Sequence, residues 1–294
     1  MGLAPSPAAS DKPCMRILVT GAAGLIGSAV AFRLRGDHEV VGLDLRRAPQ
    51  VASVADIRDA IDLTGFDAIV HVAALHAPHV RRASDAAFRA VNVDATARLL
   101  DTALAAGVSR FVYTSSTSVY GHALEPADGR AAWIDEAVEP RPRDIYDETK
   151  LEAEALVRAS GLPGAIVRMS RCFSEPLAEM ALHRLHRGID RRDVAEAHAL
   201  ALGAPGTGCE TYVVSARPAF DDEDREQLLH DAPAAIRRRA PDLAAAFGLR
   251  GWPLPRSLGR IYSPAKAAAL LGFVARHDAA TVLAGDCDPP PLGT

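Results

Sequence analysis

The sequence predicts an α/β fold built on a doubly wound parallel sheet. Short, continuous apolar runs alternate with segments of helical spacing over residues 15–170. Strands that are apolar throughout are typical of a parallel sheet covered by helices on both faces. A glycine-rich turn at 21–27 joins the first apolar run to the first helical segment. Right-handed crossovers between such strands give an open sheet of the Rossmann type.

The expected elements alternate in order along the chain. Strands are expected at 15–20, 39–45, 67–74, 110–116 and 164–170, and helices at 24–35, 84–106 and 145–160. After residue 170, a helix at 190–203 and a strand at 210–216 are expected to return to the sheet, with short helices near 222–230 and 264–271. The remaining segments are rich in proline and are expected to be irregular.

This pattern divides the chain into four parts. Residues 1–14 are expected to be a disordered tail, and residues 15–170 a dinucleotide-binding Rossmann domain. Residues 171–280 are expected to form a small C-terminal substrate-binding lobe, interleaved with the elements that return to the sheet. Residues 281–294 are expected to be a second tail. Ligands of such folds bind at the carboxyl edge of the sheet, so the lobe is expected to cover that edge.

The composition narrows the classes of function. The 294 residues are 49% apolar, with a formal net charge of −4, which is typical of a globular protein with a sizeable core. No broad basic field indicates a nucleic-acid partner. No apolar run reaches the roughly 18 residues of a membrane span, and the first residues do not resemble a signal peptide. Four scattered cysteines fit unpaired thiols in the cytoplasm and indicate no metal site.

The turn at 21–27 has the glycine spacing of a dinucleotide site. Gly21 permits a tight turn, and Gly24 lets backbone N–H groups approach a pyrophosphate. Gly27 lets the following helix pack close to the strand. The alternative is an ordinary glycine-rich connection between a strand and a helix, but here both flanking elements have the expected pattern.

Asp44 ends the second expected strand and bears on the choice of dinucleotide. A carboxylate at this place accepts hydrogen bonds from the adenosine ribose and repels a 2′-phosphate, which favours NAD. Arg46 and Arg47 follow at once and could receive that phosphate, so NADP stays open. Asp56 and Ile57 are placed either to contact the adenine or to form a surface turn.

A candidate catalytic group begins the helix expected at 145–160. Tyr146 and Lys150 are four residues apart, so both project from one helix face. An ammonium beside the phenol would lower its pKa from the usual value of ~10. Lysine is rare here, since Lys12 and Lys266 are the only others. Ser116 ends a strand, where it could donate a hydrogen bond to a substrate oxygen. The alternatives are a surface Tyr–Lys pair and a polar loop residue.

Together these motifs resemble the extended short-chain dehydrogenase/reductases, the NAD-dependent epimerase/dehydratase family. The resemblance covers roughly residues 15–272. It rests on the glycine turn, Asp44, HVAA at 71–74, Asn92-Val93, FVYTSSTSVYG at 111–121, YDETK at 146–150, RDVAEAHALAL at 192–202 and SPAKAAALLGF at 263–273.

The resemblance implies roles for individual residues. It implies that the catalytic group is Ser116, Tyr146 and Lys150. The positions that it implies for the cofactor are Gly21, Gly24, Leu25, Ile26, Gly27, Asp44, Asp56, Ile57, Ala73, Ala74, Tyr146 and Lys150. It implies a structural role for Asn92. It also implies a homodimer joined through the helices near 84–106 and 145–160.

Departures from the family pattern narrow the chemistry. Nucleotide-sugar dehydratases carry an Asp-Glu pair directly after the active hydroxyl residue, whereas this chain has Thr117 and Ser118. Those side chains cannot perform acid–base elimination, so a dehydratase is not expected. Sugar-nucleotide epimerases carry a long insertion where this chain has only residues 172–191. The shorter segment favours a smaller substrate, such as a sugar or a sugar acid.

Three residues are candidates for contact with the substrate: His76, Thr117 and Arg171. His76 follows the fourth expected strand in a loop that should face the nicotinamide. Arg171 is either a clamp for a carboxylate or phosphate, or the partner of a local acid such as Glu175. The stretch around it, 168–176, is also similar to uronate dehydrogenases. The spacing of His183 and His186 would suit two metal ligands, but we interpret them as a surface pair on a helix.

The sequence thus predicts an NAD-dependent oxidoreductase that transfers hydride at a secondary alcohol or ketone of a small substrate. An NAD-dependent sugar or nucleotide-sugar epimerase is the alternative, because the same residues can reduce a transient ketone from its other face. A non-catalytic protein that senses NAD(P) is the alternative from a different class. The intact Ser, Tyr and Lys set argues against it.

Overall fold

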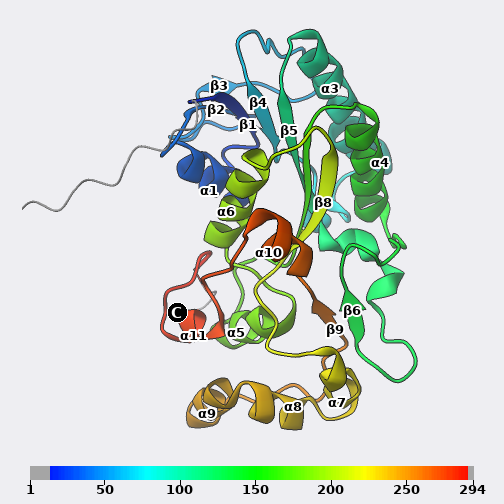
Figure 1. The fold of residues 1–294 in the computed structure, drawn as a ribbon, viewed down its shortest axis with the longest axis vertical. Helices are drawn as coiled ribbons and strands as arrows, with labels where there is room; N and C mark the ends of the chain where they lie inside the picture. The colour runs from blue at the N-terminus through cyan, green and yellow to red at the C-terminus, as the bar shows by residue number, and fades with distance from the viewer. Residues whose placement is uncertain (1–13, 291–294) are drawn as a thin grey trace, which may run out of the picture.

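The computed structural model describes residues 14–290 and has a seven-stranded parallel sheet at its centre (Figure 1). The strand order is β3-β2-β1-β4-β5-β7-β8. The strands are β1 (Arg16–Thr20), β2 (Glu39–Asp44), β3 (Ser53–Val54), β4 (Ala68–His71), β5 (Arg110–Ser116), β7 (Gly164–Met169) and β8 (Cys209–Val214). The chain winds outward in both directions from β1 and β4, so the predicted doubly wound fold is confirmed.

Helices cover both faces of this sheet (Figure 1). One face carries α1 (Leu25–Leu34) and α6 (Arg191–Leu202), and the other carries α3 (Ala95–Ala105) and α4 (Ile145–Ala159). Neighbouring strand residues belong to different apolar clusters: Val19 and Val70 pack toward α1 and α6, whereas Leu18 and Ile69 pack toward α3 and α4. Successive side chains of a strand point to opposite faces, which explains why these strands are apolar throughout.

The long helix expected at 84–106 contains a π-helical turn. It consists of α2 (Asp85–Arg89), the π turn η2 (Ala90–Asp94) and α3. Within η2, the buried side chain of Asn92 accepts a hydrogen bond from the N–H of Leu75 and donates one to its carbonyl. Asn92 also donates to Thr149 on α4. The wide turn therefore lets one amide connect this helix to the loop after β4 and to α4.

The lobe gathers at one end of the sheet in Figure 1 and is more regular than expected. Its elements are α5 (Leu177–His186), α7 (Arg225–His230), α8 (Ala232–Arg239), α9 (Pro241–Leu249), α11 (Ala279–Leu283), and the parallel pair β6 (Ala132–Ile134) and β9 (Arg260–Tyr262). The expectation of irregular chain is wrong for α8 and α9. Pro233 and Pro241 lie in the first turns of these helices, where proline costs no hydrogen bond, so the prolines mark helix starts.

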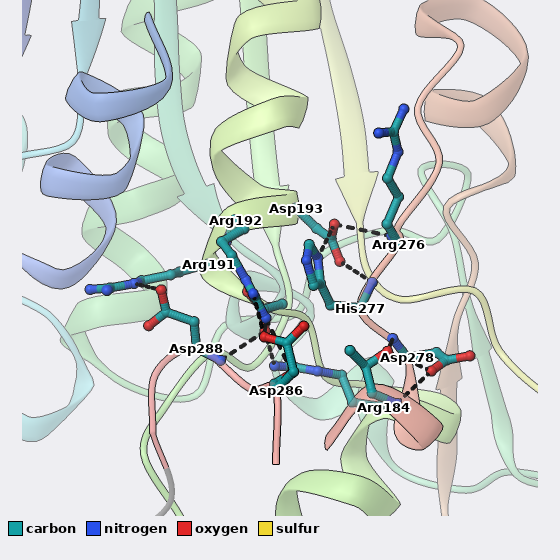
Figure 2. Close-up of polar contacts among 11 residues, drawn as sticks. Arg184, Arg191, Arg192, Asp193, Arg276, His277, Asp278, Asp286 and Asp288 are labelled. Carbon is teal, nitrogen blue, oxygen red and sulfur yellow. Dashed lines mark hydrogen bonds and ion pairs between the residues drawn. The ribbon is translucent and has the colours of Figure 1, made fainter. Parts of the chain in front are cut away.

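The prediction of a tail at residues 281–294 is wrong for residues 281–290, because these residues pack against the rest of the fold. Val282 is fully buried on α11. Beyond it, Asp286 pairs with Arg192, and Asp288 pairs with Arg191 (Figure 2). The sequence could not predict these ion pairs, because the partners of Asp286 and Asp288 lie almost 100 residues earlier, on α6. The first expected tail lies outside the described residues except for residue 14.

Two further properties bear on function. Within residues 14–290, no helix combines the length and the apolar character needed to cross a membrane. All four cysteines are free thiols.

Candidate functional site

A cavity of about 1070 Å³ runs along the carboxyl ends of the sheet strands. Its wall combines the glycine turn, the ends of β2, β4, β5 and β7, the start of α4, and parts of the lobe. Every site residue predicted from the sequence lines it: Gly21, Gly24, Leu25, Ile26, Gly27, Asp44, Asp56, Ile57, Ala73, Ala74, His76, Ser116, Thr117, Tyr146, Lys150 and Arg171. The fold therefore brings these residues together, although they are far apart in sequence.

The glycine turn has no room for side chains. Gly21 has φ +70°, and a Cβ there would lie 2.8 Å from the backbone nitrogen of Ala73. A Cβ on Gly27 would lie 2.1 Å from the carbonyl oxygen of Gly21. The turn, the end of β4 and the start of α1 thus approach as closely as their backbones allow. This open backbone surface at a helix start fits the pyrophosphate of a dinucleotide.

Asp44 stands at the end of β2, at the far end of the cavity from Tyr146. Its carboxylate accepts hydrogen bonds from the backbone N–H groups of Ala23 (3.0 Å) and Arg46 (2.9 Å). The Asp44 side chain is only 11% exposed, while the Arg46 side chain is 71% exposed with its Nε 3.7 Å from Asp44. The backbone bonds fix a carboxylate where the ribose of an adenosine would lie.

Asp56 lies beside Ile57 at the same end of the cavity. The guanidinium of Arg58 forms a fork on Asp56, with Nη2 2.6 Å from Oδ2, and this hydrogen bonding lowers the pKa of Asp56. The carboxylate therefore stays charged and oriented by its neighbour.

Ser116 and Tyr146 meet at the middle of the cavity. Ser116 is the last residue of β5, and Tyr146 lies in the first turn of α4, which Asp144 caps by accepting from the N–H of Asp147. Burial raises the pKa of Tyr146 to about 12, and a side-chain hydrogen bond with Ser116 acts in the opposite direction. Two neighbouring hydroxyl groups can together hold one substrate oxygen and exchange a proton with it.

Lys150 follows one turn later on α4 but faces a different partner from the one expected. Its Nζ donates to the carbonyl of Thr114 (2.8 Å) and to the hydroxyl of Tyr113 (3.2 Å). Burial lowers the pKa of Lys150 to about 7. The expectation that its ammonium lowers the pKa of Tyr146 is wrong for this structure, because the strand carbonyl draws the ammonium away and desolvation of the phenol dominates.

A buried ion pair lies behind Lys150 and was missed from the sequence. Glu154 accepts from Nε (2.9 Å) and Nη2 (2.7 Å) of Arg168 on β7, and also from the hydroxyl of Ser115 (2.6 Å). Its charge raises the pKa of Lys150, against the effect of burial. The i, i+4 spacing of Lys150 and Glu154 was the available signal.

The substrate end of the cavity is lined by arginine. Arg171 donates from Nε to Oε1 of Glu175 (2.8 Å) and also lines the cavity, so it has the local partner that the sequence allowed. Three arginines of this wall were missed: Arg143, Arg187 and Arg260. They come from the loop before α4, the end of α5 and the start of β9, and no local pattern connects them.

His183 and His186 are not the surface pair that the sequence suggested. The side chain of His183 is 12% exposed and contacts Glu175 through Nδ1 (2.8 Å). His186 is buried, its Nδ1 donates to the carbonyl of Arg260 (2.8 Å), and burial lowers its pKa to about 3. These helix residues pack inward because α5 packs against β9 and α11. The part of the chain from 14 to 290 contains no group of three or more His, Cys, Asp or Glu residues able to hold a metal ion.

Comparison with known proteins gives the family model and the relatives that this chain matches. Residues 17–192 match the model of the NAD dependent epimerase/dehydratase family. The chain is 35% identical over 155 residues to an L-arabinose 1-dehydrogenase (NAD(P)(+)) of Haloferax volcanii, which covers 48% of this chain and 59% of the relative. It is 46% identical over 129 residues to a UDP-glucose 4-epimerase of Mycolicibacterium smegmatis, which covers 36% and 41%. The chain thus spans roughly half the length of the curated relatives it matches.

Solved structures share the whole fold. A short-chain dehydrogenase/reductase superfamily protein of Agrobacterium tumefaciens with bound NAD matches with a TM-score of 0.70 at 24% identity, over 92% of this chain and 95% of that chain. A UDP-glucuronic acid 4-epimerase of Bacillus cereus matches with a TM-score of 0.66 at 20% identity, over 92% and 98%. At these identities the likeness establishes the fold of both the sheet and the lobe.

Proposed function

The chain belongs to the NAD dependent epimerase/dehydratase family, and we propose that it is an NAD-dependent oxidoreductase acting on a small hydroxy or keto compound. The observation that carries this proposal is that Ser116 and Tyr146 line the same cavity as the glycine turn and lie close enough together for Ser116 to lower the pKa of Tyr146. Cofactor and substrate oxygen would then share one enclosed space. The candidate substrates are a sugar, a sugar acid or a similar secondary alcohol or ketone.

NAD is the proposed cofactor, and it would supply a nicotinamide ring as hydride acceptor or donor. Gly21 and Gly24 would let backbone N–H groups reach its pyrophosphate at the start of α1. Asp44 would accept the adenosine ribose hydroxyls. We favour NAD over NADP because Asp44 is a fixed carboxylate with Arg46 drawn toward it, so a 2′-phosphate would meet negative charge first.

Proton transfer is assigned to Tyr146. Its raised pKa keeps the phenol protonated near neutral pH, so it can give its proton to a carbonyl oxygen during reduction. In the oxidation direction it would take the proton of the substrate hydroxyl, and Ser116 would hold that oxygen by a hydrogen bond. Lys150 would donate to the nicotinamide ribose, and its positive charge together with that of the oxidised nicotinamide would favour the phenolate.

The short segment 172–191 supports a small substrate. It forms the ten-residue helix α5, whose His186 donates to the carbonyl of Arg260, and it is shorter than the insertion with which sugar-nucleotide epimerases hold the nucleotide. An NAD-dependent sugar or nucleotide-sugar epimerase is the second candidate. The identity of 46% over 129 residues to a UDP-glucose 4-epimerase favours it. A non-catalytic NAD(P) sensor is disfavoured because Ser116, Tyr146 and Lys150 are all present.

A homodimer in the cytoplasm completes the proposal. The faces of α3 and α4 that do not cover the sheet would meet their copies, and Leu104 of α3 is 48% exposed there. The four free thiols are in keeping with a reducing compartment. Sedimentation of the purified protein tests the dimer, and a monomer at micromolar concentration would contradict it.

The function is tested by screening sugars, sugar acids and nucleotide sugars with NAD for absorbance of NADH. A dehydrogenase releases NADH in step with product, whereas an epimerase converts its substrate without net NADH. Tyr146→Phe should reduce turnover at least ~10²-fold, the low end of what a positioned acid–base group supplies. Tyr212→Phe, which lies outside the cavity, is the matched control. Full activity of Tyr146→Phe would exclude the proposed proton transfer.

A further inference from the structure

Two arginines at the substrate end of the cavity have no carboxylate partner. Arg187 and Arg260 line the main cavity, and both also line a second cavity of about 420 Å³ beside it. The other two arginines of this wall are neutralised, since Arg143 pairs with Asp147 and Arg171 with Glu175. Between residues 14 and 290, no ion pair includes Arg187 or Arg260. The wall between the two cavities thus carries two positive charges without an ion-pair partner.

The hydrogen bonds around Arg187 show that no carboxylate is bonded to its guanidinium group. Its Nη2 contacts Nε2 of His183 at 2.8 Å, and Nδ1 of that ring contacts Glu175 at 2.8 Å. This chain of contacts leaves Nε2 of His183 as a neutral acceptor. The Nε of Arg187 is buried and has no hydrogen-bond partner. A buried donor of a charged group without an acceptor is costly and rare, which makes this atom a place where a ligand would bind.

Glu175 attracts Arg187 only at longer range, because its hydrogen bonds go to Arg171 and His183. Although burial opposes ionisation, hydrogen bonds from His183 and Arg171 lower the pKa of Glu175 to about 2. Burial lowers the pKa of Arg187, and the nearby charge of Arg260 lowers it further. The two like charges therefore repel one another until an anion lies between them.

The backbone holds both arginines in place. The N–H groups of Arg187 and Gly188 both donate to the carbonyl of His183, at 2.8 and 2.6 Å, and a Cβ on Gly188 would lie 2.9 Å from His183. Arg260 begins β9, which pairs with β6, and its carbonyl accepts from His186. Because both backbones are fixed, the two side chains start from defined positions, which reduces the conformational entropy lost when a ligand binds.

We propose that Arg187 and Arg260 bind an anionic group, a carboxylate or a phosphate, carried by the substrate at the end remote from the reacting carbon. The planar fork of arginine matches both groups. The inference rests on the proposed function for the identity of the ligand's other end. The sequence suggested Arg171 as the clamp for such an anion. Because Arg171 is paired with Glu175, we assign that role to Arg187 and Arg260 instead.

The test is calorimetric titration of the NAD-saturated full chain with D-glucuronate, D-glucose 6-phosphate, D-glucose and inorganic phosphate. We expect at least one of the anionic probes to bind at least tenfold more tightly than D-glucose. The comparison of D-glucuronate with the two phosphates identifies which anion the site prefers. Arg187→Gln and Arg260→Gln should each weaken that binding at least tenfold and leave NAD affinity unchanged. Arg237→Gln, an exposed arginine on α8 far along the chain, is the matched control.

Several outcomes would overturn the proposal. They are binding of no anionic probe, equal binding of charged and neutral sugars, or unchanged anion affinity in both variants. Arg187→Lys guards against misfolding of the glutamine variant, because it keeps the charge and loses the fork, and it should show an intermediate loss. Failure of the proposed function is distinguishable. In that case the anion would bind in an arginine-dependent way without any formation of NADH.

Discussion

Replacing Glu154 with Gln tests the buried charge pair beneath the site. Glu154 and Arg168 are joined by two hydrogen bonds of 2.9 and 2.7 Å, and their side chains are 0% and 6% exposed. The same helix provides a matched control. Glu152 also pairs with an arginine, Arg89, but there both side chains are more than 40% exposed. The two variants remove the same chemical group from pairs that differ in burial.

The magnitude follows from that difference. Removing one member of a buried ion pair leaves the other charge without compensation and costs about 3–5 kcal/mol in the free energy of unfolding. For a domain of this size, each kcal/mol lowers Tm by roughly 2–4 °C. Glu154→Gln should therefore lower Tm by roughly 6–20 °C. Glu152→Gln should lower it far less, because water screens an exposed pair.

Thermal melts followed by circular dichroism measure both effects. A double variant, Glu154→Leu with Arg168→Met, should recover part of the loss, because it removes both charges and fills the space with apolar atoms. Equal melting of Glu154→Gln and Glu152→Gln would refute the reasoning. A double variant less stable than Arg168→Met alone would also refute it, since the pair would then contribute through packing and not through charge.

Three further predictions concern the cofactor, the catalytic group and pH. Asp44→Ala should narrow the preference for NAD over NADP in dinucleotide titrations, and tighter binding of NADP by the unaltered chain would contradict the NAD assignment. Lys150→Arg should lower turnover at least ~10²-fold while circular dichroism shows that the chain still folds, because a planar fork fits poorly where an ammonium donates to Thr114. Near-normal activity would exclude a catalytic role. Burial lowers the pKa of His186 to about 3. Below pH 6.5, the ordinary pKa of histidine, His186 therefore binds a proton in the unfolded chain but stays neutral in the folded chain. The free energy of unfolding should thus fall as the pH falls from 6.5 toward 3, by about 2 kcal/mol at pH 5. Urea unfolding at several pH values measures this dependence. His186→Gln should weaken it, whereas His230→Gln, at an exposed histidine, should leave it unchanged.

The sheet and the nucleotide end could be predicted because their signals are local. Each of the runs around Val19 and Val70 is apolar on both faces, and the turn at 21–27 joins one such run to a helix. The short strand β3 has only two residues, Ser53 and Val54, which is too few for any pattern. In the lobe, prolines at helix starts give a proline-rich composition, which is also typical of irregular chain, so the helices α8 and α9 were not predicted.

The substrate end could not be predicted in the same way. Arg187 and Arg260 come together through the hydrogen bond between His186 and the carbonyl of Arg260, a contact between segments far apart in sequence. No spacing along the chain reports such pairings. Lys150 was identified by its chemistry and its rarity, but its contact with Tyr113 depends on how deeply α4 is buried against β5. Burial of this kind is a property of the packed fold.

The attachment of residues 286–288 to the start of α6 has a consequence for folding kinetics. The fully buried carboxylate of Asp190 accepts from the N–H of Asp288, which is 98 residues further along the chain. Closing so long a loop is entropically costly, so this contact is expected to form late, after the local strand–helix units. Asp190 ends the loop that carries Arg187. In refolding experiments, anion binding should therefore appear after most of the helical signal has returned.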